Sequence, residues 1–282
     1  MVSSRLVSHV SRGRPTSDGG GVRLTRLITP QQGLDPFLML DEFDSSEASD
    51  YLAGFPAHPH RGFETVTYML DGHMLHEDHL GNRGDLKPGA VQWMTAGRGI
   101  IHSEMPQQVA GRMRGFQLWI NLPGVEKMKA ANYRDLDPEE IPEHALSDAL
   151  IKVIAGHCQV AGSEDITAGA HVGGATEPLY FDVALGTHAT LTLVTPLHHR
   201  VLAYVFEGTV SIGAQLIKKN ELAQLSHGDS VCLTAGSEPA RVLVIGGKPL
   251  REPVVHYGPF VMNTAAEIEQ AVRDFRSGQL TT

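Results

Sequence analysis

Residues 58–72 read HPHRGFETVTYMLDG, and this stretch indicates a β-sheet protein with a polar site beside one strand. The run from Glu64 to Leu70 alternates as a half-buried strand does, and Asp71-Gly72 is a hairpin turn signal. Successive side chains of a strand point to opposite faces, so residues i and i+2 share a face. His58 and His60 are therefore expected to lie side by side.

Short alternating runs of this kind, separated by turn residues, recur along the whole chain. The 282 residues include 30 glycines and 16 prolines, which favours short strands joined by tight turns over long helices. A chain of this length can form two ordinary domains. Further strands are predicted at residues 22–28, 90–94, 115–121, 191–194, 201–207, 222–225, 231–234 and 241–245.

A second pair of candidate ligands, His102 and Glu104, has the same spacing of two. If two neighbouring strands carry the two pairs, three imidazoles and one carboxylate can meet at one point. This donor set suits one divalent ion of Fe, Mn, Zn, Ni or Cu. Four protein ligands leave two positions free on an octahedral metal, where a substrate can bind. By strand parity, Glu64 could face the same point.

The other histidines give weaker signals. His73, His76 and His79 are three residues apart, a spacing that does not keep one strand face. A surface hairpin is therefore predicted there rather than a second metal site. His198 and His199 are adjacent, and a strand would point them to opposite faces. They are interpreted as surface or hydrogen-bonded histidines.

The metal-ligand pattern resembles the two-part cupin motif, with three departures. The spacing from Glu64 to Gly72 is one residue longer than in the motif. Thr95 replaces a proline of the motif. Four residues, rather than two, separate Gly97 from His102. With these departures, the runs at 58–64 and 95–104 closely resemble the pirin family of bicupins. Other stretches that look like pirin segments are residues 35–43, 117–123 and 258–264. The resemblance covers most of the chain and implies an all-β fold with two cupin-type jelly-roll barrels in tandem and a C-terminal helix.

The resemblance also implies a ligand set and a metal. In that family the metal ligands match His58, His60, His102 and Glu104. Fe(II) is favoured, with Mn, Ni, Cu or Zn as alternatives. Glu64 is then expected beside the ligands, where it would orient a histidine or a water. Either Glu104 or Glu64 could act as the catalytic proton acceptor.

Two functions follow from the resemblance. The first is an oxidoreductase of the quercetin 2,3-dioxygenase type, which opens a small aromatic flavonol with O2 and releases carbon monoxide. The metal would act as Lewis acid and template for the 3-hydroxyl and 4-carbonyl groups. Candidates for an apolar wall are Phe55, Phe63, Met94 and Met105. The alternative is a regulatory protein without turnover, in which the metal shapes a surface that binds a protein partner in transcription or metabolism.

An internal repeat supports two barrels. Residues 89–97 and 228–236 share the pattern Gly-x5-Thr-Ala-Gly, and residues 68–72 resemble residues 204–208. Aligned on these glycines, the second copy has four non-ligand residues at the ligand positions: Val194, Pro196, Arg241 and Leu243. A metal is therefore expected only in the first half.

The predicted organisation has three segments: a metal-binding barrel over residues 1–122, a connection over 123–150, and a degenerate second barrel over 151–282. The second barrel ends in a helix over residues 263–278. Thr264 and Glu267 form a capping box at its start, and Gly278 has the position of a C′ residue at its end.

The net charge and the amino-acid composition indicate which partners the protein can bind and in which cellular compartment it is found. The net charge is −9 and no run rich in Lys or Arg is present, which argues against direct binding of nucleic acid. Two cysteines cannot make a disulfide framework, and no signal peptide or membrane span is evident. We expect a cytoplasmic monomer that does not bind membranes.

Overall fold

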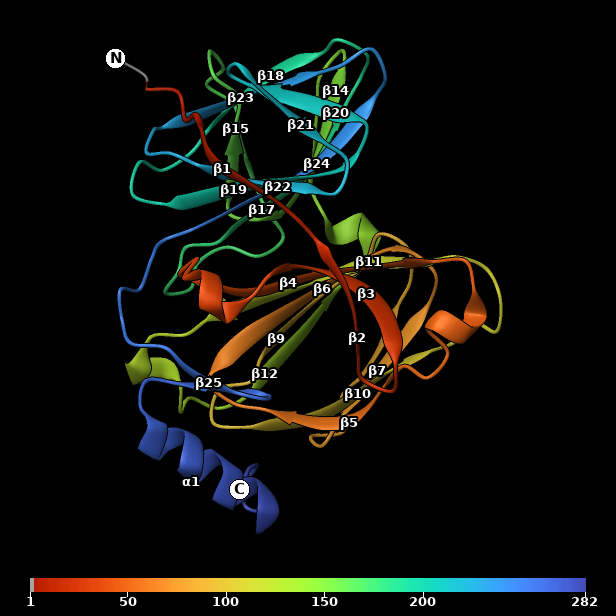
Figure 1. Ribbon diagram of the computed structural model, residues 1–282, viewed down its shortest axis with the longest axis vertical. Helices are drawn as coiled ribbons and strands as arrows, with labels where there is room; N and C mark the ends of the chain where they lie inside the picture. The colour runs from red at the N-terminus through yellow and green to blue at the C-terminus, as the bar shows by residue number, and fades with distance from the viewer. Residues whose placement is uncertain (1–2) are drawn as a thin grey trace. The chain divides into compact units, whose positions relative to one another are not determined.

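The computed structural model describes residues 3–282, and the chain divides into two compact units. The first barrel is made of residues 14–138 and 250–282. The second barrel is made of residues 139–249 together with the residues before Arg14. Strands dominate both units, as Figure 1 shows. Within residues 3–282 no helix is long and apolar enough to cross a membrane.

The first barrel is a jelly roll of two sheets. The larger sheet has the order β12 (Asn132–Leu136), β9 (Val91–Thr95), β6 (Phe63–Asp71), β11 (Met113–Asn121), β4 (Phe37–Ser45), β3 (Val22–Ile28), β2 (Arg14–Asp18). The smaller sheet has the order β5 (Phe55–His60), β10 (Ile100–Pro106), β7 (Met74–Asp78), β8 (Arg83–Leu86). In Figure 1, β5, β7 and β10 lie across from β4, β6 and β9.

The second barrel has the same construction. Its larger sheet has the order β1 (Val7–Arg12), β22 (Glu221–Leu225), β19 (Arg200–Glu207), β24 (Ala240–Gly247), β17 (Leu179–Leu185), β14 (Ala149–Ala155), β13 (Glu143–Ala145). Its smaller sheet has the order β18 (Thr190–Val194), β23 (Ser230–Ala235), β20 (Thr209–Ile212), β21 (Gln215–Lys218). A separate hairpin joins β15 (His157–Gln159) and β16 (Ile166–Ala168).

The two sheet orders match strand for strand, which confirms the prediction of tandem barrels. The alignment used for the repeat, however, is wrong. By sheet order, β9 corresponds to β22 and β10 to β23, whereas the shared Thr-Ala-Gly pattern matched β9 to β23. Arg241 and Leu243 therefore lie on the counterpart of β11, not of the strand that carries His102. The buried side chains of β18 and β23 in the second core are aliphatic: Leu191, Leu193, Val231, Leu233 and Ala235.

The grouping of segments differs from the predicted boundaries at three places. Strand β1 pairs with β22, so it belongs to the second barrel rather than to the first. The expected connection at 123–150 is divided: β12 pairs with β9 in the first barrel, and β13 pairs with β14 in the second. Residues 250–282 pack with the first barrel rather than with the second. Four short 3-10 helices complete the loops: Pro30–Gln32, Ala48–Asp50, Gly124–Glu126 and Pro138–Glu140.

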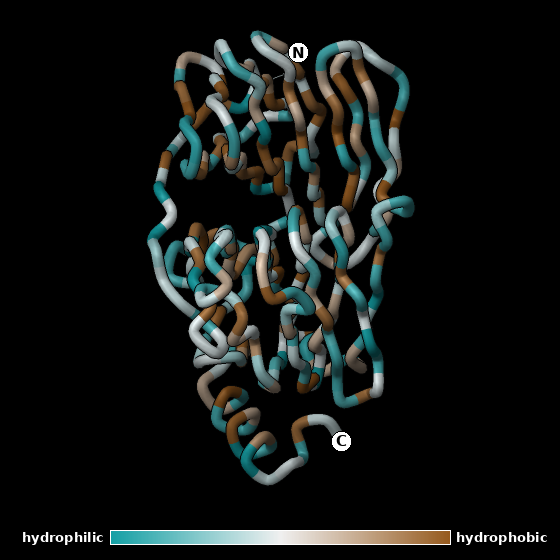
Figure 2. Tube along the Cα trace, turned by 90° about the vertical axis from the view of Figure 1, so that its right-hand side faces the viewer, coloured by the Kyte–Doolittle hydropathy of each residue, from teal (hydrophilic) through white to brown (hydrophobic). Residues whose placement is uncertain are grey.

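The terminal helix α1 (Ala265–Arg276) forms with the predicted capping box, but it belongs to the first barrel. Its buried Ile268 and Ala271 pack against the hairpin of β25 (Val255–Tyr257) and β26 (Phe260–Met262). Asp274 of the helix pairs with the buried guanidinium of Arg61 at 2.7 Å. Along the helix next to the C-terminus, hydrophobic and hydrophilic residues alternate in Figure 2, as expected for a one-sided helix.

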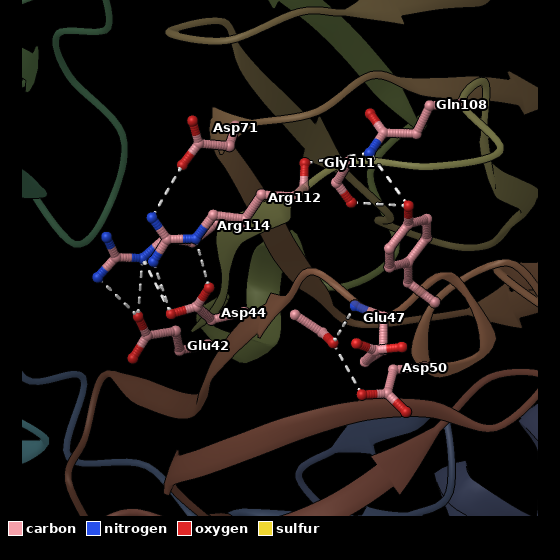
Figure 3. Close-up of polar contacts among 11 residues, drawn as sticks. Glu42, Asp44, Glu47, Asp50, Asp71, Gln108, Gly111, Arg112 and Arg114 are labelled. Atoms are coloured by element: carbon pink, nitrogen blue, oxygen red, sulfur yellow. Dashed lines mark hydrogen bonds and ion pairs between the residues drawn. The ribbon is translucent and has the colours of Figure 1, made fainter.

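Arginine–carboxylate pairs join β11 to β4 at the rim of the first barrel. Figure 3 shows Arg112 and Arg114 between Asp71 on one side and the acidic residues of β4 on the other. Arg112 makes a bidentate pair with Asp44, at 2.8 and 2.9 Å. The buried Arg114 lies 3.2 Å from Glu42. Planar guanidinium–carboxylate pairs of this kind fix the orientation of both side chains.

Candidate metal centre

Strands β5 and β10 present the two predicted ligand pairs from adjacent positions. They pair antiparallel, with His102 directly opposite His58. Strand β5 lies at the edge of its sheet, where the missing N–H of Pro59 between the two histidines costs no ladder hydrogen bond. The register shifts between His102 and Glu104, which places Glu104 opposite Phe55.

The three predicted imidazoles converge. One nitrogen of each of His58, His60 and His102 lies within 4.8 Å of the other two. The ring centroids are 4.7 Å apart for His58 and His60, 4.3 Å for His58 and His102, and 4.9 Å for His60 and His102. Imidazole nitrogens at these separations could bind one metal ion together.

The free ring nitrogens have the properties that a metal site needs. Nδ1 of His60 and Nε2 of His102 are buried and have no hydrogen-bond partner among residues 3–282. Nδ1 of His58 lies 2.8 Å from the Pro56 carbonyl, which leaves its Nε2 free to bind. Burial lowers the pKa of His60 and of His102 well below the usual value, so both rings are neutral at physiological pH. Neutral imidazoles whose ring nitrogens lack hydrogen-bond partners can bind a metal ion.

Glu104 belongs to a second group that shares His102. The ligand atoms of His76, His102 and Glu104 lie within 4.8 Å of one another. Burial raises the pKa of Glu104, and the Thr67 hydroxyl donates a hydrogen bond to its Oε1 at 3.1 Å. The structure thus brings the four predicted ligands into two overlapping groups rather than into one set of four.

His76 is the residue that sequence reasoning missed, because the surface hairpin predicted for it is wrong. It is fully buried on β7, opposite Glu104 on β10, and its ring stacks on Tyr133. Its Nδ1 lies 3.2 Å from Nδ1 of His102. Burial lowers the pKa of His76 to about 4. The sequence feature that could have predicted this burial is the spacing of two from Met74 to His76 to Asp78. On a strand, this spacing puts His76 on the same face as the apolar Met74.

Replacing His76 by phenylalanine is expected to weaken metal binding by about 10- to 100-fold. If His102 binds metal through Nε2, its Nδ1 carries the proton and donates to Nδ1 of His76, which fixes the tautomer. Competition with a chelator measures the affinity. His76→Asn, whose side-chain oxygen can accept the same hydrogen bond, should recover part of the loss. His73→Phe, at a residue outside both groups, is the control. Equal losses from His73→Phe and His76→Phe would contradict this role.

Glu64 is not brought to the metal group, contrary to expectation. The Thr95 hydroxyl donates to its Oε1 at 2.6 Å, and Lys129 lies 3.9 Å away. Thr67, which contacts Glu104, lies three residues along β6 and so on the opposite face of that strand. Burial raises the pKa of Glu64. Its contacts assign it to packing between β6 and β9.

The two buried glutamates offer a matched test of these placements. Glu104→Gln is expected to lower metal affinity by more than about tenfold, because it removes an anionic oxygen from the ligand cluster. Glu64→Gln should leave metal affinity unchanged, because its partners are Thr95 and Lys129. Metal titration followed by calorimetry measures both variants. An affinity loss in Glu64→Gln as large as in Glu104→Gln would show that the placement of Glu64 is wrong.

A cavity of about 520 Å³ is lined by His58, His60 and Glu104 among the predicted ligands. Its lining includes apolar side chains from both sheets and from the edge strand β5: Leu24, Met39, Phe43, Phe55, Met74 and Trp119. Of the predicted apolar wall, Phe55 lines the cavity, whereas Phe63 and Met94 are buried in separate core clusters.

The C-terminal segment completes the cavity wall. His256, Gly258 and Pro259, at the hairpin of β25 and β26, line the cavity. This hairpin approaches Gly62 so closely that a Cβ there would lie 2.0 Å from the Val261 carbonyl oxygen, and the φ of Gly62 is +93°. A glycine is therefore required between the ligand strand and β6. Because residues 250–282 help to form the site, the site cannot be built from the N-terminal half alone.

Comparison with known proteins gives a consistent family assignment. The pirin family profile matches residues 21–120, and the profile of the pirin C-terminal cupin domain matches residues 180–281. A Pseudomonas aeruginosa protein provisionally named quercetin 2,3-dioxygenase is 53% identical, with 99% of each chain covered. Human pirin is 42% identical over 99% of this chain and 95% of its own.

One solved structure is similar to this chain in both fold and sequence. It is a crystal structure of quercetin 2,3-dioxygenase from Acinetobacter baumannii, 34% identical, with a TM-score of 0.89 and 99% of both chains covered. The tandem cupin fold of this chain therefore has a counterpart in a solved structure.

Proposed function

The chain belongs to the pirin family, and we propose that it is a metal-dependent dioxygenase that opens a flavonol such as quercetin with O2 and releases carbon monoxide. One observation carries the proposal: the imidazoles of His58, His60 and His102 converge, and two of them, His58 and His60, line a cavity with apolar walls. The names of the Pseudomonas and Acinetobacter relatives support a small aromatic substrate and O2 as the reactants.

The residues that would hold the metal are His58, His60, His102 and Glu104, with Fe(II) as the proposed ion. When bound, this ion supplies Lewis acidity and a template that lowers the pKa of a substrate hydroxyl. His58 and His60 would hold it from the edge strand β5, and His102 and Glu104 from the neighbouring strand β10.

The cavity would bind and orient the substrate. Its volume of about 520 Å³ falls within the range of about 300–1,000 Å³ usual for small-molecule sites. Met39, Phe43 and Trp119 provide surfaces for planar aromatic rings. Arg26, which is paired with Asp41 at 2.7 Å in the same lining, provides polar groups for ring hydroxyls. The apolar walls exclude bulk water from the reacting atoms.

Glu104 is the proposed acceptor of the 3-hydroxyl proton. Burial raises its pKa, which makes its carboxylate a stronger base than an exposed one. The Thr67 hydroxyl at 3.1 Å holds one carboxylate oxygen in place. Glu64, which faces away from this group, takes no part in the proposed proton transfer.

The function is tested by turnover of a metal-loaded protein. Protein loaded with Fe(II) under anaerobic conditions and then given air and quercetin should consume the flavonol and release CO. Loss of flavonol absorbance and detection of CO measure the reaction, and parallel loading with Mn, Ni, Cu or Zn ranks the metals. Full metal occupancy without turnover for all five ions would contradict the dioxygenase and favour the regulatory alternative.

A further inference from the structure

A second cluster of metal-binding side chains lies in the second barrel. Glu177 precedes β17, and His198 and His199 precede β19. Both strands pair antiparallel with β24, one on each side, so they run parallel and begin at the same end of the sheet. Glu177 and His198, which are 21 positions apart in sequence, therefore lie at the same end of the sheet.

The three side chains converge on one carboxylate oxygen. Nε2 of His198 lies 3.4 Å from Oε2 of Glu177, and Nε2 of His199 lies 3.5 Å from the same atom. The ligand atoms of all three residues lie within 4.8 Å of one another. The prediction that adjacent histidines diverge is wrong here, because His198 and His199 lie in the turn before β19, where strand alternation does not apply.

His199 gives a further indication of a ligand. Its side chain is 1% exposed, its Nδ1 has no hydrogen-bond partner among residues 3–282, and its Nε2 lies 3.5 Å from Glu177 without forming a hydrogen bond. Buried polar groups are usually hydrogen-bonded, so an imidazole in this state is suited to bind an ion. Burial lowers the pKa of His199 to about 4, so the ring is neutral and can offer a lone pair.

We propose that Glu177, His198 and His199 form a second metal site, which binds Zn(II) and is independent of the first barrel. Two imidazoles and a glutamate are an established zinc donor set that leaves one position open. Ligand atoms about 2.0 Å from a tetrahedral ion lie about 3.3 Å from each other. The two histidine–glutamate separations, 3.4 and 3.5 Å, are close to this value. Glu177 and His198 are about half exposed, so the open position faces solvent.

Neighbouring cations limit the affinity of this site. Nζ of Lys248 lies 3.0 Å from the other carboxylate oxygen of Glu177, Oε1, and the guanidinium charge of Arg5 acts on His199. Lys248 thereby orients Oε2 toward the histidines while its charge opposes a bound cation. Lys248→Ala should therefore tighten zinc binding several-fold.

The proposal is tested by counting zinc in a tag-free chain. Equilibrium dialysis against micromolar free Zn(II), followed by elemental analysis, should give two ions per wild-type chain. His58→Ala/His60→Ala should keep one ion, and adding Glu177→Gln and His198→Ala should remove it. His227→Ala, at an exposed histidine of the same barrel, is the matched control and should leave the count unchanged.

Two results would overturn the second site. One is a His58→Ala/His60→Ala chain that binds no zinc. The other is a count that does not fall when Glu177→Gln and His198→Ala are introduced. If the variant of the first barrel does not fold, Glu177→Gln/His198→Ala alone in the wild-type chain gives the same answer, a drop from two ions to one. Flavonol turnover depends on the first barrel only, so it distinguishes failure of this site from failure of the dioxygenase proposal.

Discussion

His102→Ala is expected to abolish metal binding and quercetin turnover together, with the rate falling at least about a thousandfold, or about 4 kcal/mol of transition-state stabilisation. His102 is the one residue common to both ligand groups, so its loss breaks the contacts to His58 and His60 and those to Glu104. Metal content by elemental analysis and the rate of flavonol loss measure the two effects.

A matched control separates chemistry from folding. Ser103→Ala lies on the same strand as His102 and on its opposite face, and it should retain both metal and turnover. Circular dichroism checks that His102→Ala keeps the strand content. A His102→Ala chain that is folded and still holds one metal ion in the first barrel would refute the assignment of the centre.

The largest effect on stability is expected from Lys127→Met, which should lower the free energy of unfolding of the first barrel by about 3–5 kcal/mol. The buried ammonium donates to the carbonyl of Gly62 at 2.7 Å, to Oδ1 of Asn121 at 2.6 Å and to the carbonyl of Val261 at 3.0 Å. Burial lowers its pKa only to about 8, so at neutral pH three N–H groups meet three acceptors. Methionine fills a similar volume but removes the donor that these three oxygens share.

Intrinsic fluorescence can follow this barrel alone. The chain has two tryptophans, Trp93 and Trp119, and both belong to the first barrel. Urea unfolding monitored by their emission should show the loss in Lys127→Met. Lys129→Met, at a half-buried lysine of the same segment, should cost no more than about 1 kcal/mol. Equal costs for the two variants would contradict the role given to Lys127.

Local patterns in the sequence were sufficient for the elements that depend on neighbours along the chain. The strand at residues 22–28 and the helix capped by Thr264 form as predicted. The spacing of two in His58-x-His60 presents both imidazoles to the same group. These features need only the period of a strand or the satisfaction of a helix terminus, and both are set within a few residues.

The orientation of Glu64 could not be predicted from such patterns. Parity counted from His60 assumed one continuous strand, but β5 ends at His60 and β6 begins at Phe63 in the other sheet. Gly62, with a φ of +93°, turns the chain between them. Side-chain alternation does not carry across such a break, so the face of Glu64 could not be counted from the histidines.

The sequence by itself determined the strand pattern, the capped helix and the two histidine-containing pairs, because each depends on spacing within a few residues. It also indicated two barrels, although its Thr-Ala-Gly repeat matched strands that do not correspond in the sheets. Only the tertiary structure decided that His76 lies against His102, that residues 250–282 close the first cavity, and that Glu177 meets His198 and His199. These contacts depend on which strands pair and in which register. That choice is made by burial of apolar surface across the whole barrel, between residues that no short-range pattern connects.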